Sequence, residues 1–256
     1  ILVENTRKCL AKMASNFFGN PAKKLRLVGV TGTKGKTTTT FMIKSILEKA
    51  GKKVGLIGTV AVYIGDKLVK NSDRTTPESN KLQEILDKMY QLGVEVVIME
   101  VSSQSLMLDR VAGMEFYAGV FTNLSEDHIS EKEHKDINEY FECKMKLFDM
   151  CKYAFSNADN LYSAKVPELI KEKCKVETYG IDNYCDLLAK DVTITNTYAD
   201  FKVKIETRNE RVKVSIPGRF SVYNALAAIS VARLFGAKAE TIKEALEDIK
   251  VLGRSE

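Results

Sequence analysis

A glycine-rich segment between an apolar run and a helix-forming stretch is the first place where this sequence could carry chemistry. Residues 31–38 read TGTKGKTT. The glycines let the backbone curl so that its N–H groups converge on phosphate oxygens at the positive end of a helix dipole. Lys36 would then reach the β- and γ-phosphates of ATP, and Thr37 would offer its hydroxyl to Mg²⁺. The loop is a shortened form, because Val30 stands where the general pattern has its first glycine.

The alternative is a glycine turn that does no more than cap a helix. The complete Gly-Lys-Thr triplet in a strand–loop–helix setting favours the phosphate loop. The residues that we expect to bind the nucleotide phosphates are Gly32, Thr33, Lys34, Gly35, Lys36, Thr37 and Thr38.

Two other segments could supply ligands to a metal ion. Glu100 follows the apolar run Val94–Met99. A carboxylate at the carboxyl end of a buried parallel strand faces the crevice where ligands of open α/β sheets bind, and it could hold Mg²⁺ directly or through water. The two histidines, His128 and His134, share one loop, and Asp127-His128 resembles a metal- or phosphate-facing pair. Solvated side chains are the alternative for Glu100 and for both histidines.

Lys144 stands out because it lies on the apolar face of its predicted helix. Ile137, Phe141, Leu147, Phe148 and Cys151 form the apolar stripe around it, and Lys146 lies off that stripe. A lysine on such a face must snorkel to solvent, pair with an acid, or lower its pKa. A neutral amine can add CO₂ and become a carbamate, which is an oxygen ligand for a metal ion. Snorkelling is the commoner outcome for a lysine in this setting.

The elements that must position these residues alternate in type from residue 25 to about residue 179. Such alternation is typical of a doubly wound α/β sheet, mostly parallel and of the phosphate-loop type. The expected strands are 25–31, 53–60, 94–101, 116–121 and 153–156, and the expected helices are 36–50, 78–92 and 136–151. Thr76 is the expected N-cap of the second helix, with Pro77 at its first position.

The pattern changes in the C-terminal part of the chain. Segments 191–195, 201–207 and 211–216 alternate polar and apolar residues, which predicts a small antiparallel sheet with one solvated face. Two helices, 221–235 and 239–249, are expected after it. We expect residues 1–22 to be the tail of an N-terminal domain and its linker, and residues 23–256 to be a central ATP-binding domain. We expect the C-terminal ligase domain to be absent from these residues.

Composition limits the class of protein and its partners. The formal charge is +5 and the lysines are scattered, so we expect no nucleic-acid partner. No apolar run approaches the roughly 20 residues that a membrane-spanning helix needs, so we expect no membrane insertion. The five cysteines include no Cys-x-x-Cys pair, which favours a reducing compartment, the cytoplasm.

Six segments together resemble the Mur ligases. They are TGTKGKTT at 31–38, RTTPE at 74–78, MEVSSQSLMLDRV at 99–111, FTNLSEDH at 121–128, YFECKMKLF at 140–148 and PGRFSVYNALAA at 217–228. The resemblance covers the whole chain and is strongest to the Mur ligases that add the third amino acid to UDP-N-acetylmuramoyl-L-Ala-D-Glu.

The resemblance implies roles that the residues alone do not. Thr75, Thr76, Ser102 and Arg110 match contacts to the UDP-muramoyl-peptide substrate, and Asn224 matches an asparagine near the adenine. Glu100 and His128 match metal-binding positions, Lys36 matches the key cation, and Lys144 matches a lysine that the family carbamylates. Lys36, Lys144 and His128 are therefore the expected catalytic residues, and the metal ligands are expected from Thr37, Glu100, His128 and Lys144.

The implied activity is that of an ATP-dependent amide ligase that works through an acyl phosphate in peptidoglycan precursor synthesis. Its expected partners are ATP, Mg²⁺, the UDP-muramoyl-dipeptide and an amino acid, and we expect a monomer. Two alternatives stay open. One is a related Mur or folylpolyglutamate-type ligase, and the other is a non-catalytic nucleotide-binding module.

Overall fold

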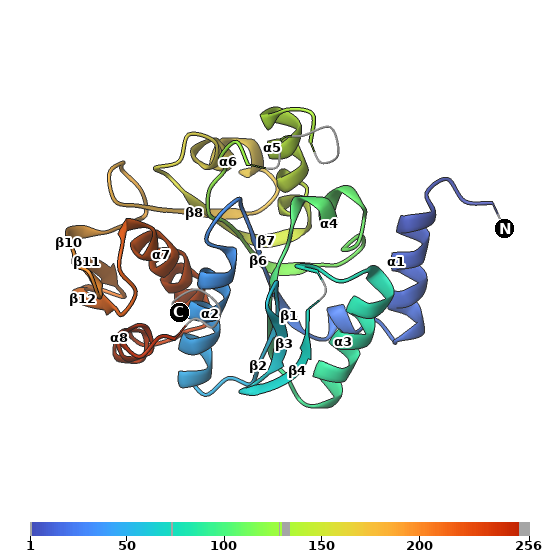
Figure 1. The fold of residues 1–256 in the computed structure, drawn as a ribbon, viewed down its shortest axis with the longest axis horizontal. Helices are drawn as coiled ribbons and strands as arrows, with labels where there is room; N and C mark the ends of the chain where they lie inside the picture. The colour runs from blue at the N-terminus through green and yellow to red at the C-terminus, as the bar shows by residue number, and fades with distance from the viewer. Residues whose placement is uncertain (1, 73, 128, 130–133, 251–256) are drawn as a thin grey trace.

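The computed structural model describes residues 2–72, 74–127, 129 and 134–250, which fold around one large sheet and one small sheet (Figure 1). The large sheet has the strand order β4-β3-β2-β5-β1-β6-β7-β8-β9. Its strands are β1 (Arg26–Thr31), β2 (Val54–Ile57), β3 (Ala61–Ile64), β4 (Lys67–Asn71), β5 (Val96–Glu100), β6 (Phe116–Phe121), β7 (Cys151–Asn157), β8 (Lys175–Gly180) and β9 (Leu187–Leu188). From β2 to β9 every neighbouring pair is parallel, while β3 pairs antiparallel with both β2 and β4.

Helices cover both faces of this sheet. They are α1 (Thr6–Phe17), α2 (Lys36–Lys49), α3 (Ser79–Gln91), α4 (Ser103–Met107), α5 (Ile137–Met145), α6 (Val166–Ile170), α7 (Arg219–Leu234) and α8 (Ala239–Glu247). Figure 1 shows α2, α7 and α8 on one side of the sheet and α1 and α3 on the other. Successive residues of β1 alternate between the two layers, because Val28 and Val30 join the core on the α2 side while Leu27 joins the other core.

The small sheet consists of β10 (Lys190–Ile194), β11 (Ala199–Ile205) and β12 (Arg208–Val214), all antiparallel. Along β11 the side chains of Ala199, Phe201, Val203 and Ile205 are buried, and those between them are more exposed. One face therefore packs on the core and the other meets solvent. The expected fold class, a mostly parallel α/β sheet with a small antiparallel sheet near the C-terminal part, is confirmed.

Several predicted element boundaries were wrong. The second expected strand ends at Ile57 and is followed by the antiparallel strands β3 and β4, because the chain turns back at residues 58–60. Helix α3 begins at Ser79 with Glu78 as its N-cap, so neither Thr76 nor Pro77 has the predicted position. The Thr76 hydroxyl instead donates to the Glu100 carbonyl and accepts from Ser102 N–H, which takes it away from the helix end.

The predicted helix 136–151 is also shorter than expected. Helix α5 ends at Met145, and a 3₁₀ turn at Phe148–Met150 leads directly into β7. The turn tightens there because Phe148 is buried against β6 before the chain re-enters the sheet at Cys151. Leu147 and Phe148 are buried as the apolar stripe predicted, but they lie on the turn and not on the helix.

Within the described residues, none of the helices has both the length and the apolar character needed to cross a lipid bilayer.

Gly119 of β6 allows the end of this helical segment to pack closely on the sheet. A Cβ atom at Gly119 would lie 2.6 Å from Cys151 Sγ and 3.1 Å from Phe148 Cε1. Gly55 of β2 has an equally short approach, 2.6 Å, but to Sδ of Met89, near the end of a flexible side chain. The two glycines are therefore suitable for comparison, because a new Cβ atom would approach its neighbour equally closely at both, but the neighbouring side chain is flexible only at Gly55.

We expect Gly119→Ala to lower the free energy of unfolding by about 1–3 kcal/mol, because Cys151 and the Phe148 ring have little freedom to move. Gly55→Ala should cost clearly less, because Met89 can change rotamer. Urea unfolding of both variants would measure the difference. Equal losses would contradict the packing described for β6.

Candidate functional site

The glycine-rich loop connects β1 to α2, and at two of its glycines the backbone lies very close to a neighbouring side chain. Gly32 and Gly35 have φ angles of 140° and 86°, which favour glycine. A Cβ atom at Gly32 would collide with the Thr122 hydroxyl, and one at Gly35 would collide with the Asn224 side-chain oxygen. Both positions therefore require glycine for space as well as for conformation.

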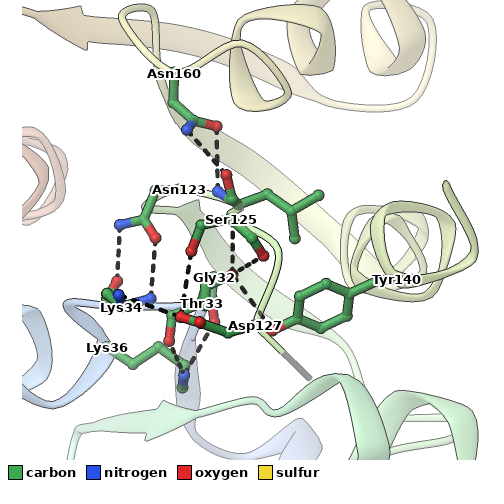
Figure 2. A network of polar contacts seen from close by, with 10 residues as sticks. Gly32, Thr33, Lys34, Lys36, Asn123, Ser125, Asp127, Tyr140 and Asn160 are labelled. Atoms are coloured by element: carbon green, nitrogen blue, oxygen red, sulfur yellow. Dashed lines mark hydrogen bonds and ion pairs between the residues drawn. The ribbon is translucent and has the colours of Figure 1, made fainter. Parts of the chain in front are cut away.

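The end of β6 holds the loop from one side (Figure 2). Asn123 accepts from Thr33 N–H with its carbonyl and from Lys34 N–H with Oδ1, each at 2.9 Å. Its Nδ2 donates back to the Lys34 carbonyl, which also accepts from Thr122 Oγ1 at 2.7 Å. The Lys34 ammonium pairs with Asp127 at 3.3 Å. These bonds fix the shape of the loop without a ligand.

The first turn of α2 has the features of an anion-binding helix end. Gly35 is the N-cap residue, and it has no side chain that could cap the helix. The first N–H groups of a helix have no partner inside the helix and carry the positive end of its dipole. Lys36 lies at the start of this turn, and its Nζ donates to the carbonyls of Gly32, at 3.0 Å, and Thr33, at 2.9 Å. The side chain is thus folded back over the loop that it is expected to serve.

Thr37 and Glu100 meet beneath the loop. The Thr37 hydroxyl donates to Glu100 Oε1 at 3.0 Å. The buried carboxylate also accepts from Thr59, whose N–H bonds Oε1 and whose hydroxyl bonds Oε2, both at 2.9 Å. Sequence reasoning missed Thr59, because it follows the end of β2 in a segment without a motif.

These oxygens suit Mg²⁺. Magnesium in phosphate-transfer sites is held by one or two protein oxygens together with the phosphates and water, so a hydroxyl beside a buried carboxylate fits it. Among the residues that the structure describes, no group of three His, Cys, Asp or Glu side chains could hold a metal ion. The predicted ligand His128 lies outside the described residues.

Lys144 is buried and does not snorkel, because only 1% of the residue is exposed. Its Nζ donates to the Gly32 carbonyl at 3.1 Å and lies 4.2 Å from the centre of the Tyr140 ring. Burial lowers the pKa of Lys144 well below its usual value, and the positive charge of Lys36 lowers it further. The apolar-stripe interpretation therefore located a buried amine next to the phosphate loop.

The residues expected to bind the muramoyl-peptide gather around the end of β5. Arg110 is 3% exposed, donates to the Thr76 carbonyl at 3.2 Å and forms an ion pair with Glu78 at 2.9 Å. Burial lowers the pKa of Arg110 while Glu78 opposes that shift. Ser102 caps α4 by accepting from Ser105 N–H, and the Thr75 hydroxyl lies 3.2 Å from that of Thr59. Thr76 is fully buried beneath them.

One cavity of about 270 Å³ is lined both by the glycine-rich loop with Lys144 and by residues expected to bind the muramoyl-peptide. It is lined by Lys36, Arg74, Thr75, Ser102, Ser103, Gln104, Met107, Arg110, His134, Tyr140 and Lys144. Five of these were predicted from the sequence, one from the phosphate loop, one from the apolar stripe and three from the resemblance. Asn224 does not line this cavity. It lies near Gly35, and its Oδ1 accepts from Thr39 Oγ1 at 3.3 Å.

His134 and Tyr140 lie deeper in this region than the sequence indicated. His134 is 3% exposed, and its Nε2 lies 2.9 Å from the Ser103 hydroxyl. Its ring centre lies 4.8 Å from that of Tyr140. The solvated alternative for His134 is therefore wrong. Tyr140 could have been noticed from its spacing, because it lies one helical turn before Lys144.

Known proteins of similar sequence and fold match the whole chain. A family model described as the Mur ligase middle domain matches residues 30–232. The chain is 47% identical over 257 residues to a UDP-N-acetylmuramoyl-L-alanyl-D-glutamate–2,6-diaminopimelate ligase of Caldanaerobacter subterraneus subsp. tengcongensis. It is 46% identical over 257 residues to the ligase of the same name from Clostridium botulinum. Each alignment covers 100% of this chain and 52% of the relative, so the chain spans about half the length of these relatives.

A solved structure of a ligase with that name has the same fold, with a TM-score of 0.87 at 24% identity. The match covers 98% of this chain and 52% of that one.

The buried amine gives a test by pH. We expect Lys144→Met to raise the free energy of unfolding at neutral pH, because it removes the cost of burying the amine. The folded-state pKa is lowered and the unfolded-state pKa is ordinary, so between them the unfolded chain binds more protons. Wild-type stability should therefore rise with pH up to about 10.5, and the advantage of Lys144→Met should shrink over that window.

Urea unfolding from neutral to alkaline pH would measure this difference, with Lys146→Met, at an exposed position two residues away, as the control. A pH-independent difference between Lys144→Met and the wild type would contradict the lowered pKa.

Proposed function

The chain belongs to the Mur ligase family, and on that premise we propose that it is the ATP-binding part of an amide ligase. The substrate is UDP-N-acetylmuramoyl-L-Ala-D-Glu, and the product is its tripeptide. We take the incoming amino acid, 2,6-diaminopimelate, from the names of relatives 46–47% identical to this chain. The family is ATP-dependent. A cytoplasmic location is supported by the five cysteines, all of which are free thiols.

The observation that carries the proposal is the shared cavity. Lys36 of the phosphate loop, the buried Lys144 and the substrate-matching Arg110 line the same space. A ligase of this kind must bring a phosphate and a carboxylate into contact, and cationic groups on both sides of one cavity suit two anionic substrates. A nucleotide-binding module without catalysis has no use for a buried amine beside the loop.

In the proposed reaction the γ-phosphoryl group of ATP passes to the D-Glu carboxylate, which gives an acyl phosphate and releases ADP. The amine of the second substrate then attacks the acyl carbon, the tetrahedral intermediate expels phosphate, and the amine nitrogen loses a proton to solvent. Lys36 releases the loop carbonyls and stabilises charge on the transferring group. Thr37 and Glu100 would hold Mg²⁺, which when bound offsets the charge of the phosphate oxygens.

The other residues would bind and orient the substrates. Arg110, Ser102 and Thr75 contact the muramoyl-peptide, and Thr76 fixes the backbone of Glu100 and Ser102 between them. The N–H groups at the start of α2, with Gly35 and Thr38, bind the phosphates. Asn224 contacts the nucleotide on the adenine side.

We also propose that Lys144 works as a carbamate. Its low pKa favours the neutral amine, whose nitrogen attacks the carbon of CO₂ while an N–H proton passes to solvent. The carbamate is anionic, so in this buried position a cation must offset its charge. Mg²⁺ and Lys36, which shares the Gly32 carbonyl with Lys144, are the cations available.

The test of the proposed function uses the full-length protein with Mg-ATP, UDP-muramoyl-dipeptide and diaminopimelate, and detects phosphate and the tripeptide product. Lys36→Met should lower turnover about 10²-fold or more, because it removes a charge that stabilises the transferring phosphoryl group. Lys49→Met, at the other end of α2, removes a partly exposed lysine and should retain activity. Phosphate transfer to folate in place of the muramoyl-dipeptide would identify a folylpolyglutamate-type ligase, and no product from either acceptor would contradict a ligase.

The carbamate has its own prediction. Lys144→Ala should abolish turnover, and short carboxylic acids should partly restore it because a carboxylate can occupy the vacated space. Lys144→Arg should resist such rescue, because the longer cation fills the pocket. Rescue is measured as turnover against acid concentration. If the full-length protein with Lys144→Ala kept the activity of the wild type, the proposed role of Lys144 would be overturned.

A further inference from the structure

Tyr140 joins the phosphate loop to the helix that carries Lys144. It is 1% exposed and lies on α5, one turn before Lys144. Its hydroxyl accepts a hydrogen bond from Thr33 Oγ1 at 3.4 Å, and Figure 2 shows the ring reaching from the helix to the loop. The same Thr33 hydroxyl accepts from Ser125 N–H at 3.1 Å. The tyrosine therefore reaches the loop at the point where the end of β6 also holds it.

The ring also bounds the position of the buried amine. Lys144 Nζ lies over the ring, 4.2 Å from the ring centre, and 3.1 Å from the Gly32 carbonyl oxygen. Among the described residues, Lys144 forms no ion pair with an acidic side chain within 4.0 Å. The nitrogen is thus located by a carbonyl of the loop on one side and by an uncharged ring on the other.

A third contact connects Tyr140 to the part of the cavity that is lined by Ser102 and Ser103, where the muramoyl-peptide is expected to bind. The His134 ring centre lies 4.8 Å from that of Tyr140, and His134 Nε2 lies 2.9 Å from the hydroxyl of Ser103. Ser103 begins α4, directly after Ser102. Cys143, on the same helix as Tyr140, donates through Sγ to the Ser103 carbonyl at 3.0 Å. Tyr140 therefore lies between the glycine-rich loop, which is expected to bind the nucleotide, and the start of α4, which is expected to contact the muramoyl-peptide.

We infer that Tyr140 is a positioning residue that sets the place of the Lys144 nitrogen relative to the phosphate loop. The inference deepens the proposed function, on which its consequence for turnover rests. The hydroxyl of Tyr140 contacts Thr33, whose own hydroxyl proton is shared between Tyr140 and the Ser125 carbonyl, and the ring closes the space into which the lysine could otherwise swing. A tyrosine does both without adding a charge that would hold Lys144 as an ammonium.

Two variants separate the parts played by the hydroxyl and the ring. Tyr140→Phe keeps the ring and loses the bond to Thr33, whereas Tyr140→Leu loses the ring and keeps an apolar side chain. Tyr179→Phe is the matched control, because Tyr179 is equally buried and donates its hydroxyl to the Phe121 carbonyl at 3.1 Å, outside the cavity. A purely structural role for Tyr140 predicts that Tyr140→Leu lowers the stability but leaves the position of Lys144 Nζ and the kcat as they are in Tyr179→Phe.

The first measurement is a crystal structure of the 256-residue chain for each variant. We expect Lys144 Nζ to stay at the Gly32 carbonyl in Tyr140→Phe and Tyr179→Phe, and to leave hydrogen-bond distance in Tyr140→Leu. An unmoved Nζ in Tyr140→Leu would overturn the inference. This result does not depend on catalysis, so it stands even where the full-length protein proves not to be a ligase.

The second measurement is turnover by the full-length protein. Tyr140→Leu should lower kcat at least tenfold and leave the KM values for ATP and for the muramoyl-dipeptide within about twofold. Tyr140→Phe should recover most of that loss, as the conservative variant, and Tyr179→Phe should match the wild type within twofold. Equal kcat for Tyr140→Leu and Tyr179→Phe, or a loss confined to KM, would count against a positioning role. Should Tyr140→Leu fail to fold, Thr33→Val combined with Tyr140→Phe replaces it, and additive losses in kcat would contradict the link.

Discussion

The Gly32 carbonyl oxygen accepts hydrogen bonds from two lysines that arrive on different helices, and the arrangement of the site follows from this contact. Lys36 comes from α2 and Lys144 from α5. Two amines at one buried oxygen repel each other as cations, so burial and mutual repulsion together favour a neutral Lys144. The phosphates of a nucleotide are the anions that the loop geometry suits.

Bringing the two helices this close requires small residues in the loop and in the sheet beneath them. Gly32 lets the loop touch Thr122 at the end of β6, and Gly119 lets Phe148 and Cys151 pack directly on that strand. The side chains of Thr122 and Asn123 then satisfy backbone groups of the loop that a regular strand or helix would have satisfied. The order of strands matters here, because β1 lies between β5 and β6 and so receives Glu100 from one neighbour and Asn123 from the other.

Sequence reasoning was most successful where one residue type is tied to one physical requirement. The glycine-rich loop between a strand and a helix, the buried parallel strands and the position of Lys144 on an apolar face could all be predicted from local pattern. The contacts of Tyr140, Thr59 and Ser103 could not, because they join residues 31 or more positions apart: Tyr140 with Thr33, Thr59 with Glu100, Ser103 with His134. The predicted cap at Thr76 failed for the same reason, since a distant carbonyl competes for its hydroxyl. The roles of the substrate-matching residues came from resemblance and not from pattern.

The folded-back Lys36 has a consequence for which anions can enter. The two hydrogen bonds that it makes to loop carbonyls must break before it can reach a ligand. A chain of phosphates offers several charged oxygens that can replace both bonds at once. The lysine thus favours ligands of high negative charge, and because Asn123 already holds the loop in shape, the move of Lys36 to such a ligand requires no refolding of the loop backbone.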